Sequence, residues 1–204
     1  MNGGEALVET LVAWGIEAAF AVPGESYLPV LAALQRRANA IRLVTPRHES
    51  GVTFACAAYG RIAGKPSVGL VSRGPGSTNA SIGLHVARQD SVPMLLVIGD
   101  VPTASKGREA FQEIDYHNMF SGITKAVLEP ASAAEVPAKA ARALELAMAG
   151  RPGPVVLVMR RIFRTARQAR APFHRRRPVS RCSRTRRSSP RLPGVSMRQK
   201  DPSS

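Results

Sequence analysis

The chain has 204 residues, which is enough for one domain of ordinary size followed by a tail. A formal net charge of +15 usually indicates a nucleic acid or an anionic surface as partner, but here the charge is unevenly distributed. Residues 1–159 contain 14 Lys/Arg against 13 Asp/Glu, whereas residues 160–204 contain 15 basic residues against Asp201 alone. We therefore expect a nearly neutral globular domain at 1–159 and a basic tail at 160–204.

Secretion, membrane insertion and metal binding find no support in the sequence. The N-terminus has no basic segment followed by an apolar one, and no apolar run reaches the roughly 18 residues of a membrane span. We therefore expect a cytoplasmic protein. Cys56 and Cys182 lie far apart without metal-ligand spacing, and Cys56 falls on the apolar face of an expected helix, so we predict a reduced core thiol there.

Helical and strand patterns alternate along residues 1–159. In chain order we expect a helix over 4–14, a strand over 18–22, a helix from near 26, a strand over 41–44, a helix from 46 to about 63, a strand over 68–72, a helix over 77–89, a strand over 94–98, a polar stretch over 100–115, a strand over 123–128, a helix over 133–149 and a strand over 154–159.

The ends and faces of these helices follow from capping residues and apolar spacing. Asn2 is expected to cap the first helix and Gly15 to close it, while Thr45 is expected to cap the third with Pro46 at its first position. The predicted buried faces are Leu28, Leu31 and Leu34 in the second helix, Val52, Cys56, Tyr59 and Ile62 in the third, and Val136, Ala140, Leu144 and Ala147 in the last.

This alternation predicts an α/β fold, a three-layer sandwich in which helices cover both faces of a six-stranded, mostly parallel sheet. Ligands of such folds bind at the carboxyl ends of the strands. The turns at 23–26, 45–49, 72–79 and 99–113 are all expected at that edge of the sheet.

Two features at that edge are individually ordinary. Glu49 lies in the first turn of a helix, where a carboxylate gains only about 0.3–1 kcal/mol from the helix dipole. Gly74-Pro75-Gly76 permits either a tight turn or the approach of an anion to a helix N-terminus. It is neither a dinucleotide fingerprint, because position 79 is asparagine, nor a phosphate-binding loop ending in Gly-Lys-Ser/Thr.

Seven motifs in one order carry more information than either feature. They are Val22-Pro23-Gly24, Pro46-Arg47-His48-Glu49, Ala58-Tyr59-Gly60-Arg61-Ile62-Ala63-Gly64-Lys65-Pro66, Gly74-Pro75-Gly76-Ser77-Thr78-Asn79, Gln89-Asp90-Ser91-Val92-Pro93, Ala110-Phe111-Gln112-Glu113 and Gly150-Arg151-Pro152-Gly153-Pro154-Val155. Their order and spacing resemble the N-terminal pyrimidine-binding domain of the acetolactate synthase-like family of thiamine diphosphate enzymes. The resemblance covers about residues 1–159.

The resemblance implies a catalytic role for Glu49. It matches the glutamate that hydrogen-bonds N1′ of the cofactor's aminopyrimidine and favours the 4′-imino tautomer, whose nitrogen removes the thiazolium C2 proton. The resulting ylid attacks a 2-keto acid, and decarboxylation leaves an enamine that can add to a second carbonyl compound. Such a site needs a carboxyl group sheltered from water, so that it can share a proton with a weak ring base.

Further site residues also follow from the resemblance. Gln112 is expected as a second catalytic residue, a polar contact near the reacting centre, and Gly24 is expected where the backbone approaches closely. The remaining positions that match residues lining the family's cofactor cleft are Pro23, Gly74, Asn79 and Phe111. His48 points away from Glu49 on a helix, so a packing or polar-contact role is expected for it.

The family holds the diphosphate through magnesium at a Gly-Asp-Gly motif, which this sequence lacks. Gly99-Asp100 is followed by Val101 and matches the family's Gly-x-Val-Pro turn, so we expect no metal site there. The resemblance thus implies half of a thiamine diphosphate site, with Mg²⁺ bound only through a missing domain, and leaves the use of FAD open. We expect a truncated domain that is inactive alone and that self-associates or binds a diphosphate-domain partner. The alternatives are a binding or regulatory module that associates with such a partner, and a nucleic-acid-binding protein that acts through its basic tail.

Residues 160–204 contain 14 arginines, many prolines and serines, and no apolar periodicity. One interpretation is a basic arm for nucleic acid or anionic lipid, although only Phe163 and Phe173 could stack on bases, which disfavours nucleic acid. A second is a solvated, disordered tail. We favour a third, the product of a shifted reading frame, because a GC-rich gene read out of frame gives such a composition.

Overall fold

The computed structural model describes residues 1–160 of the chain. Its centre is a six-stranded sheet in the order β2-β1-β3-β4-β6-β5, in which every strand pair is parallel. The strands are β1 (Ala18–Ala21), β2 (Arg42–Val44), β3 (Ser67–Ser72), β4 (Met94–Asp100), β5 (Val127–Leu128) and β6 (Pro154–Arg160).

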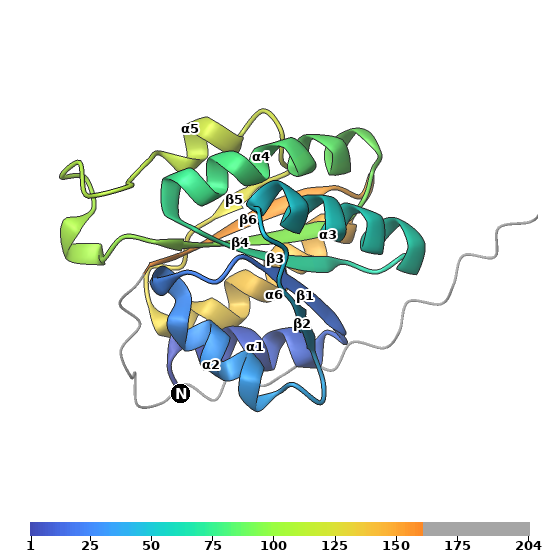
Figure 1. Ribbon diagram of the computed structural model, residues 1–204, viewed down its shortest axis with the longest axis horizontal. Helices are drawn as coiled ribbons and strands as arrows, with labels where there is room; N and C mark the ends of the chain where they lie inside the picture. Colours follow the sequence, from blue (N-terminus) through green and yellow to red (C-terminus); the bar gives the residue numbers. More distant parts are fainter. Residues whose placement is uncertain (161–204) are drawn as a thin grey trace, which may run out of the picture. The chain divides into compact units, whose positions relative to one another are not determined.

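Helices cover both faces of this sheet (Figure 1). They are α1 (Gly3–Ala13), α2 (Leu28–Arg36), α3 (Glu49–Ala63), α4 (Arg73–Gln89), α5 (Tyr116–Phe120) and α6 (Val136–Met148), with short 3₁₀ turns η1 (Glu25–Tyr27), η2 (Thr103–Ser105) and η3 (Ala133–Glu135). One face carries α1, α2 and α6, and the other carries α3, α4 and α5. The predicted three-layer α/β sandwich is confirmed, with an entirely parallel sheet.

The side-chain alternation of the central strands divides the core into two clusters. In β4, Leu95 and Val97 pack with α1, α2 and α6, whereas Leu96 and Ile98 pack with α3, α4 and α5. The residues of β3, β4 and β6 are almost all buried, because these strands have helices on both sides and strands at both edges. Burial on both faces explains why the sequences of these three strands are almost continuously apolar.

The helix patterns identified most elements but misplaced two helix starts. The third helix begins at Glu49, not at Pro46, because His48 has an extended backbone and its ring nitrogen Nδ1 accepts from the Ser50 amide as the N-cap. The fourth begins at Arg73, so Gly74-Pro75-Gly76 forms its first helical turn and does not precede it. Proline fits there because the first amides of a helix have no intrahelical acceptor.

Two predicted buried faces were partly wrong. Leu28 is 56% exposed, because the inward row of α2 is Val30, Ala33 and Leu34. Ile62 is 87% exposed, because α3 packs through Cys56, Ala57 and Gly60 and thereby turns residue 62 to the outside. The predicted face of α6 is confirmed.

Smaller elements also differ from expectation. The strand expected over 123–128 is limited to Val127–Leu128, and the preceding helix α5 was not anticipated. Cys56 is a buried free thiol in the core, where burial raises its pKa to about 12. Apart from Arg160, the basic tail lies outside the described residues.

Candidate active site

Glu49 is the first residue of α3 and lies beside the first turns of α4 at the carboxyl edge of the sheet. The side-chain amide of Asn79 donates to Glu49 Oε2 over 3.0 Å. The other oxygen, Oε1, faces Gly76, where a Cβ atom would lie 3.4 Å away. Glu49 is half-buried, and within the described part of the chain Oε1 has no hydrogen-bond donor. One carboxylate oxygen is therefore fixed, and the other is open to a ligand.

Tyr27, in η1, is a buried residue whose hydroxyl feels the charge of Glu49, and it was not among the residues predicted for the site. Its hydroxyl donates to the carbonyl oxygen of Val22. Burial, and secondarily the negative charge of Glu49, raise the pKa of Tyr27 above its usual value. The phenol therefore stays neutral beside Glu49. The only sequence signal for it was its place just after the Val22-Pro23-Gly24 motif.

Gly24 is required where the turn after β1 crosses the end of β3. A Cβ at position 24 would lie 2.6 Å from the Cβ of Ser72, which is closer than real Cβ contacts. Beside this crossing, the hydroxyls of Ser26 and Ser72 are 2.7 Å apart and form a hydrogen bond. The close approach expected of Gly24 is thus an approach to β3, while neighbouring Pro23 is exposed.

Gly74 brings the segment after β4 against the N-terminus of α4. Its amide donates to the carbonyl oxygen of Gln112 over 2.9 Å, and a Cβ at position 74 would lie 2.8 Å from that same oxygen. Gln112 has a φ of 66°, in the left-handed region, and neighbouring Phe111 is 76% exposed. The structure therefore brings the backbone of Gln112 to α4 and leaves Phe111 facing solvent.

The oxygens of Asp100 are both engaged by the protein. Oδ1 accepts from the hydroxyl of Tyr116 over 3.0 Å, and Oδ2 pairs with Lys106 Nζ at 3.1 Å. Burial, followed by the charge of Asp100, raises the pKa of Tyr116. Within residues 1–160 no group of three or more His, Cys, Asp or Glu side chains is arranged to hold a metal ion.

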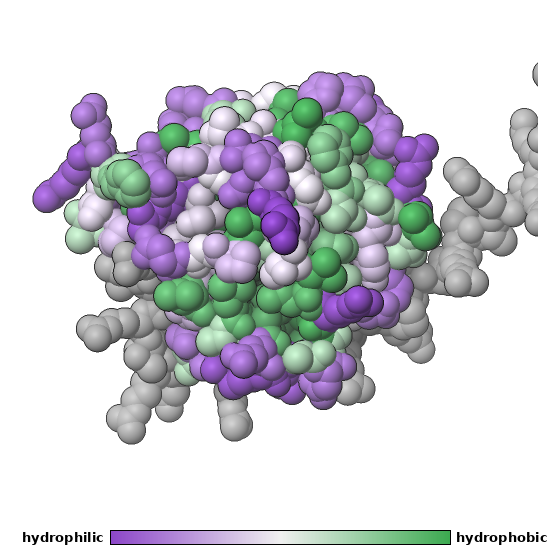
Figure 2. Space-filling model, in the orientation of Figure 1, coloured by the Kyte–Doolittle hydropathy of each residue, from purple (hydrophilic) through white to green (hydrophobic). Residues whose placement is uncertain are grey.

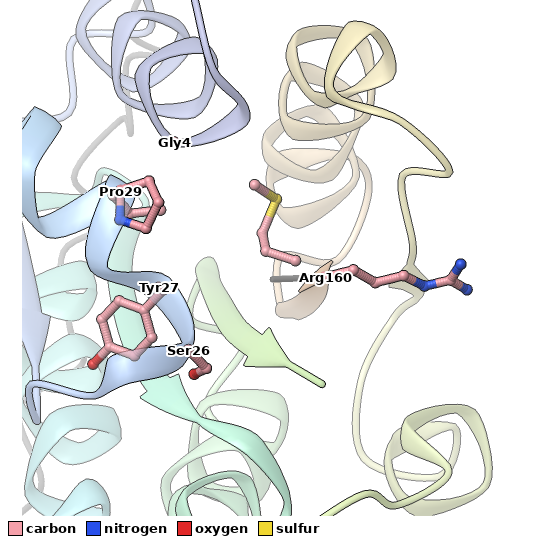
Figure 3. A pocket seen from close by; sticks show the side chains of 7 residues that line it. Gly4, Ser26, Tyr27, Pro29 and Arg160 are labelled. Carbon is pink, nitrogen blue, oxygen red and sulfur yellow. The ribbon is translucent and has the colours of Figure 1, made fainter. Parts of the chain in front are cut away.

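A small pocket lies between η1, the starts of α1 and α2, and the end of β6. Gly4, Ser26, Tyr27, Pro29 and Arg160 are among its lining residues (Figure 3). The Arg160 side chain points away from Tyr27 in this view, so few polar groups converge on the pocket.

No helix of residues 1–160 is long and apolar enough to cross a membrane.

The similarity of this chain to known proteins identifies its family. The family described as "Thiamine pyrophosphate enzyme, N-terminal TPP binding domain" matches residues 1–119. The chain belongs to this family. Its fold is therefore that of a thiamine pyrophosphate-binding N-terminal domain.

Similar curated proteins of the family are acetolactate synthases. The chloroplastic acetolactate synthase of Arabidopsis thaliana is 40% identical over 156 residues, covering 76% of this chain and 23% of the relative. The isozyme 1 large subunit of Escherichia coli (strain K12) is 37% identical over 165 residues, which are 81% of this chain and 29% of the relative. The mitochondrial catalytic subunit of Saccharomyces cerevisiae is 36% identical over 157 residues. The chain thus spans about a quarter of the length of these relatives.

The groups around Glu49 fit one part of thiamine diphosphate. An aminopyrimidine ring offers a ring nitrogen, which a carboxylate oxygen such as Oε1 can bind, and Gly76 leaves the space in front of that oxygen clear. In the first turn of α4, the Gly74 amide is already engaged by the Gln112 carbonyl.

Proposed function

We propose that this chain supplies the pyrimidine-binding half of the thiamine diphosphate site of an acetolactate synthase-like enzyme acting on 2-keto acids. The observation that supports it most directly is the Glu49 carboxylate, with Oε2 held by Asn79 and Oε1 open beside Gly76. The similarity to acetolactate synthases over about three quarters of the chain supports the reaction class.

In this proposal Glu49 shares a proton with the pyrimidine ring nitrogen through Oε1. Asn79 orients the carboxylate by donating to Oε2, so that the hydrogen-bonding geometry is set before the cofactor binds. Gly76 leaves room in front of Oε1, and the loop that carries Gln112 and Phe111 would face the reacting carbons. Bound thiamine diphosphate would supply a stabilised carbanion at C2 for addition to the keto group.

The diphosphate and Mg²⁺ are assigned to a separate domain in this proposal. The described residues contain no metal-binding cluster, and both oxygens of Asp100 are engaged by Lys106 and Tyr116. The chain alone would then hold half of the cofactor and be inactive. Its partner would be a diphosphate domain or a longer relative, and we propose a cytoplasmic location, which cell fractionation would test.

The decisive assay is exchange of the cofactor's C2 proton with and without a complementary diphosphate domain. We expect no acceleration by the chain alone, acceleration by the pair, and loss of that acceleration in Glu49→Gln. Glu9→Gln serves as the matched control, because Glu9 pairs with Arg37 on the surface far from the site. Fast exchange by the lone chain, or unchanged exchange in the complemented Glu49→Gln variant, would contradict the proposal.

A further inference from the structure

The segment from Val101 to Asp115 carries Phe111 and Gln112, yet it contains almost no regular structure, with one 3₁₀ turn at Thr103–Ser105. A segment of this kind needs side-chain contacts to hold one conformation. We call residues 101–115 the β4–α5 loop. Three sets of contacts fasten it, at its base, at its tip and against α4.

The base of the loop is fastened by one buried carboxylate. Asp100 ends β4 and is fully buried, Lys106 lies six residues further along, and Tyr116 begins α5. The carboxylate accepts from the Tyr116 hydroxyl with Oδ1 and pairs with Lys106 through Oδ2. Lys106 Nζ also lies 5.3 Å from the centre of the Tyr116 ring.

The tip is closed by Glu113. Its Oε1 accepts from the Gly107 amide over 2.7 Å and its Oε2 from the Ala110 amide over 3.1 Å. The Gln112 carbonyl, one residue earlier, accepts from the Gly74 amide. The position of Gln112 therefore depends on both ends of the loop and on α4.

We propose that Asp100, Lys106 and Tyr116 form a latch that sets the position of Gln112 against the N-terminus of α4. They are positioning residues, because they act through the loop without touching the site. A buried carboxylate is costly unless paired, so the Asp100 charge favours the conformation in which Lys106 and Tyr116 both reach it. Only the assignment of Gln112 to the reacting centre rests on the proposed function.

The latch can be tested by amide hydrogen exchange in the full chain without cofactor. Lys106→Met, Asp100→Asn and Tyr116→Phe nearly preserve side-chain volume. The first removes the ammonium from both Asp100 and the Tyr116 ring, the second removes the buried charge, and the third removes the hydroxyl that donates to Asp100. In Lys106→Met and Asp100→Asn we expect roughly tenfold faster exchange at Gly74 and at residues 107–113, on the order of losing a hydrogen bond to a charged group. Lys106→Arg should retain the protection of these amides. The double variant Lys106→Met with Asp100→Asn should exchange only slightly faster than Lys106→Met alone.

Lys65→Met is the matched control, because it removes a surface ion pair with Glu17 at 2.7 Å and should leave loop exchange unchanged. Unaltered exchange at Gly74 and residues 107–113 in both Lys106→Met and Asp100→Asn would overturn the latch. This measurement needs no cofactor, so it stands if the proposed function fails.

A second readout tests positioning in the enzyme assembled with a diphosphate domain. Lys106→Met should lower kcat for carboligation, while C2-proton exchange, assigned to Glu49, stays within about twofold of the unmodified pair. Equal loss of both would indicate general structural damage and overturn the positioning assignment.

Discussion

Single residues decide how closely α3 and α4 approach. A Cβ at Gly83 would lie 2.3 Å from Thr53 Oγ1 and 2.7 Å from the Thr53 backbone carbon, so the two helices touch through this glycine. The Thr53 hydroxyl also donates to the Ala80 carbonyl over 2.9 Å. The glycine sets the distance between the helices that carry Glu49 and Asn79.

Gly83→Ala should therefore destabilise the protein, although alanine is the better helix former. The helix preference gains about 1 kcal/mol, but overpacking against a backbone atom costs about 1–3 kcal/mol or more. Gly76→Ala is the control, since its Cβ would make ordinary contacts at 3.4 and 3.5 Å. Urea unfolding should show a lower midpoint for Gly83→Ala only, and equal midpoints would contradict the inferred clash.

Glu113 gives the β4–α5 loop a pH dependence. The Gly107 and Ala110 amides lower its pKa, with smaller contributions in the same direction from Lys106 and the Arg108 amide, and desolvation opposes them. Because the folded pKa lies below the ordinary 4.5, loop closure is fully favoured above that value and is lost as the pH falls through the folded pKa. Exchange at Gly107 and Ala110, corrected for intrinsic rates, should accelerate below about pH 4.5.

In Glu113→Gln, exchange at Gly107 and Ala110 should no longer accelerate at low pH, and these amides should be less protected at every pH. Glu109→Gln, on the same loop, should keep the acceleration at low pH. An acid transition that persists in Glu113→Gln would assign it to another group.

The sequence identified Glu49 and Asn79 as candidates but could not show that they touch. They are 30 residues apart on two helices, and their contact depends on the packing at Gly83. Tyr27 and Lys106 were missed for a related reason. Tyr27 is influenced by Glu49, which is distant in sequence, and Lys106 pairs with Asp100 across an irregular loop. The catalytic roles of Glu49 and Gln112 remain predictions.

At the scale of elements, α1 shows how local signals succeed. Asn2 Oδ1 accepts from the Glu5 amide and Glu5 accepts from the Asn2 amide, both over 2.9 Å, which completes a capping box. Asn2→Ala should lower stability by about 1 kcal/mol, and Asn2→Gly by only a few tenths. Thermal unfolding of both variants measures this, and an Asn2→Ala protein as stable as the original would show that the cap contributes nothing.

Local signals fail where tertiary contacts set the boundaries. The start of α3 depends on the His48 ring, an uncommon N-cap that residue preferences rank below Thr45. The first turn of α4 includes two glycines and a proline, which read as a turn in isolation. The parallel sheet, by contrast, was predictable because its central strands β3, β4 and β6 are mostly apolar on both faces.

At the scale of the whole molecule, α3 and α4 leave apolar side chains uncovered. Phe54, Ile62 and Ile82 are all exposed, and Figure 2 shows apolar residues at the surface in the region of these helices. The same helices carry Glu49 and Asn79. A partner that covers Phe54, Ile62 and Ile82 would remove this apolar surface from water.

We expect the chain to self-associate through this face at concentrations of tens of micromolar, a range chosen for a weak exposed-patch contact. Ile62→Asp with Ile82→Asp should shift sedimentation toward the monomer. Met148→Asp, on α6 at the opposite face of the sheet, should not. A strictly monomeric unmodified chain would count against the predicted association.

The strand order has a consequence for the time course of synthesis. β6 lies between β4 and β5, so residues 154–160 complete the interior of a sheet whose other strands are made earlier. Until they leave the ribosome, one edge of the apolar strand β4 has no neighbour and is open to unwanted pairing. Before β6 is synthesised, the nascent chain therefore contains most of its core residues while this edge of β4 is still unpaired.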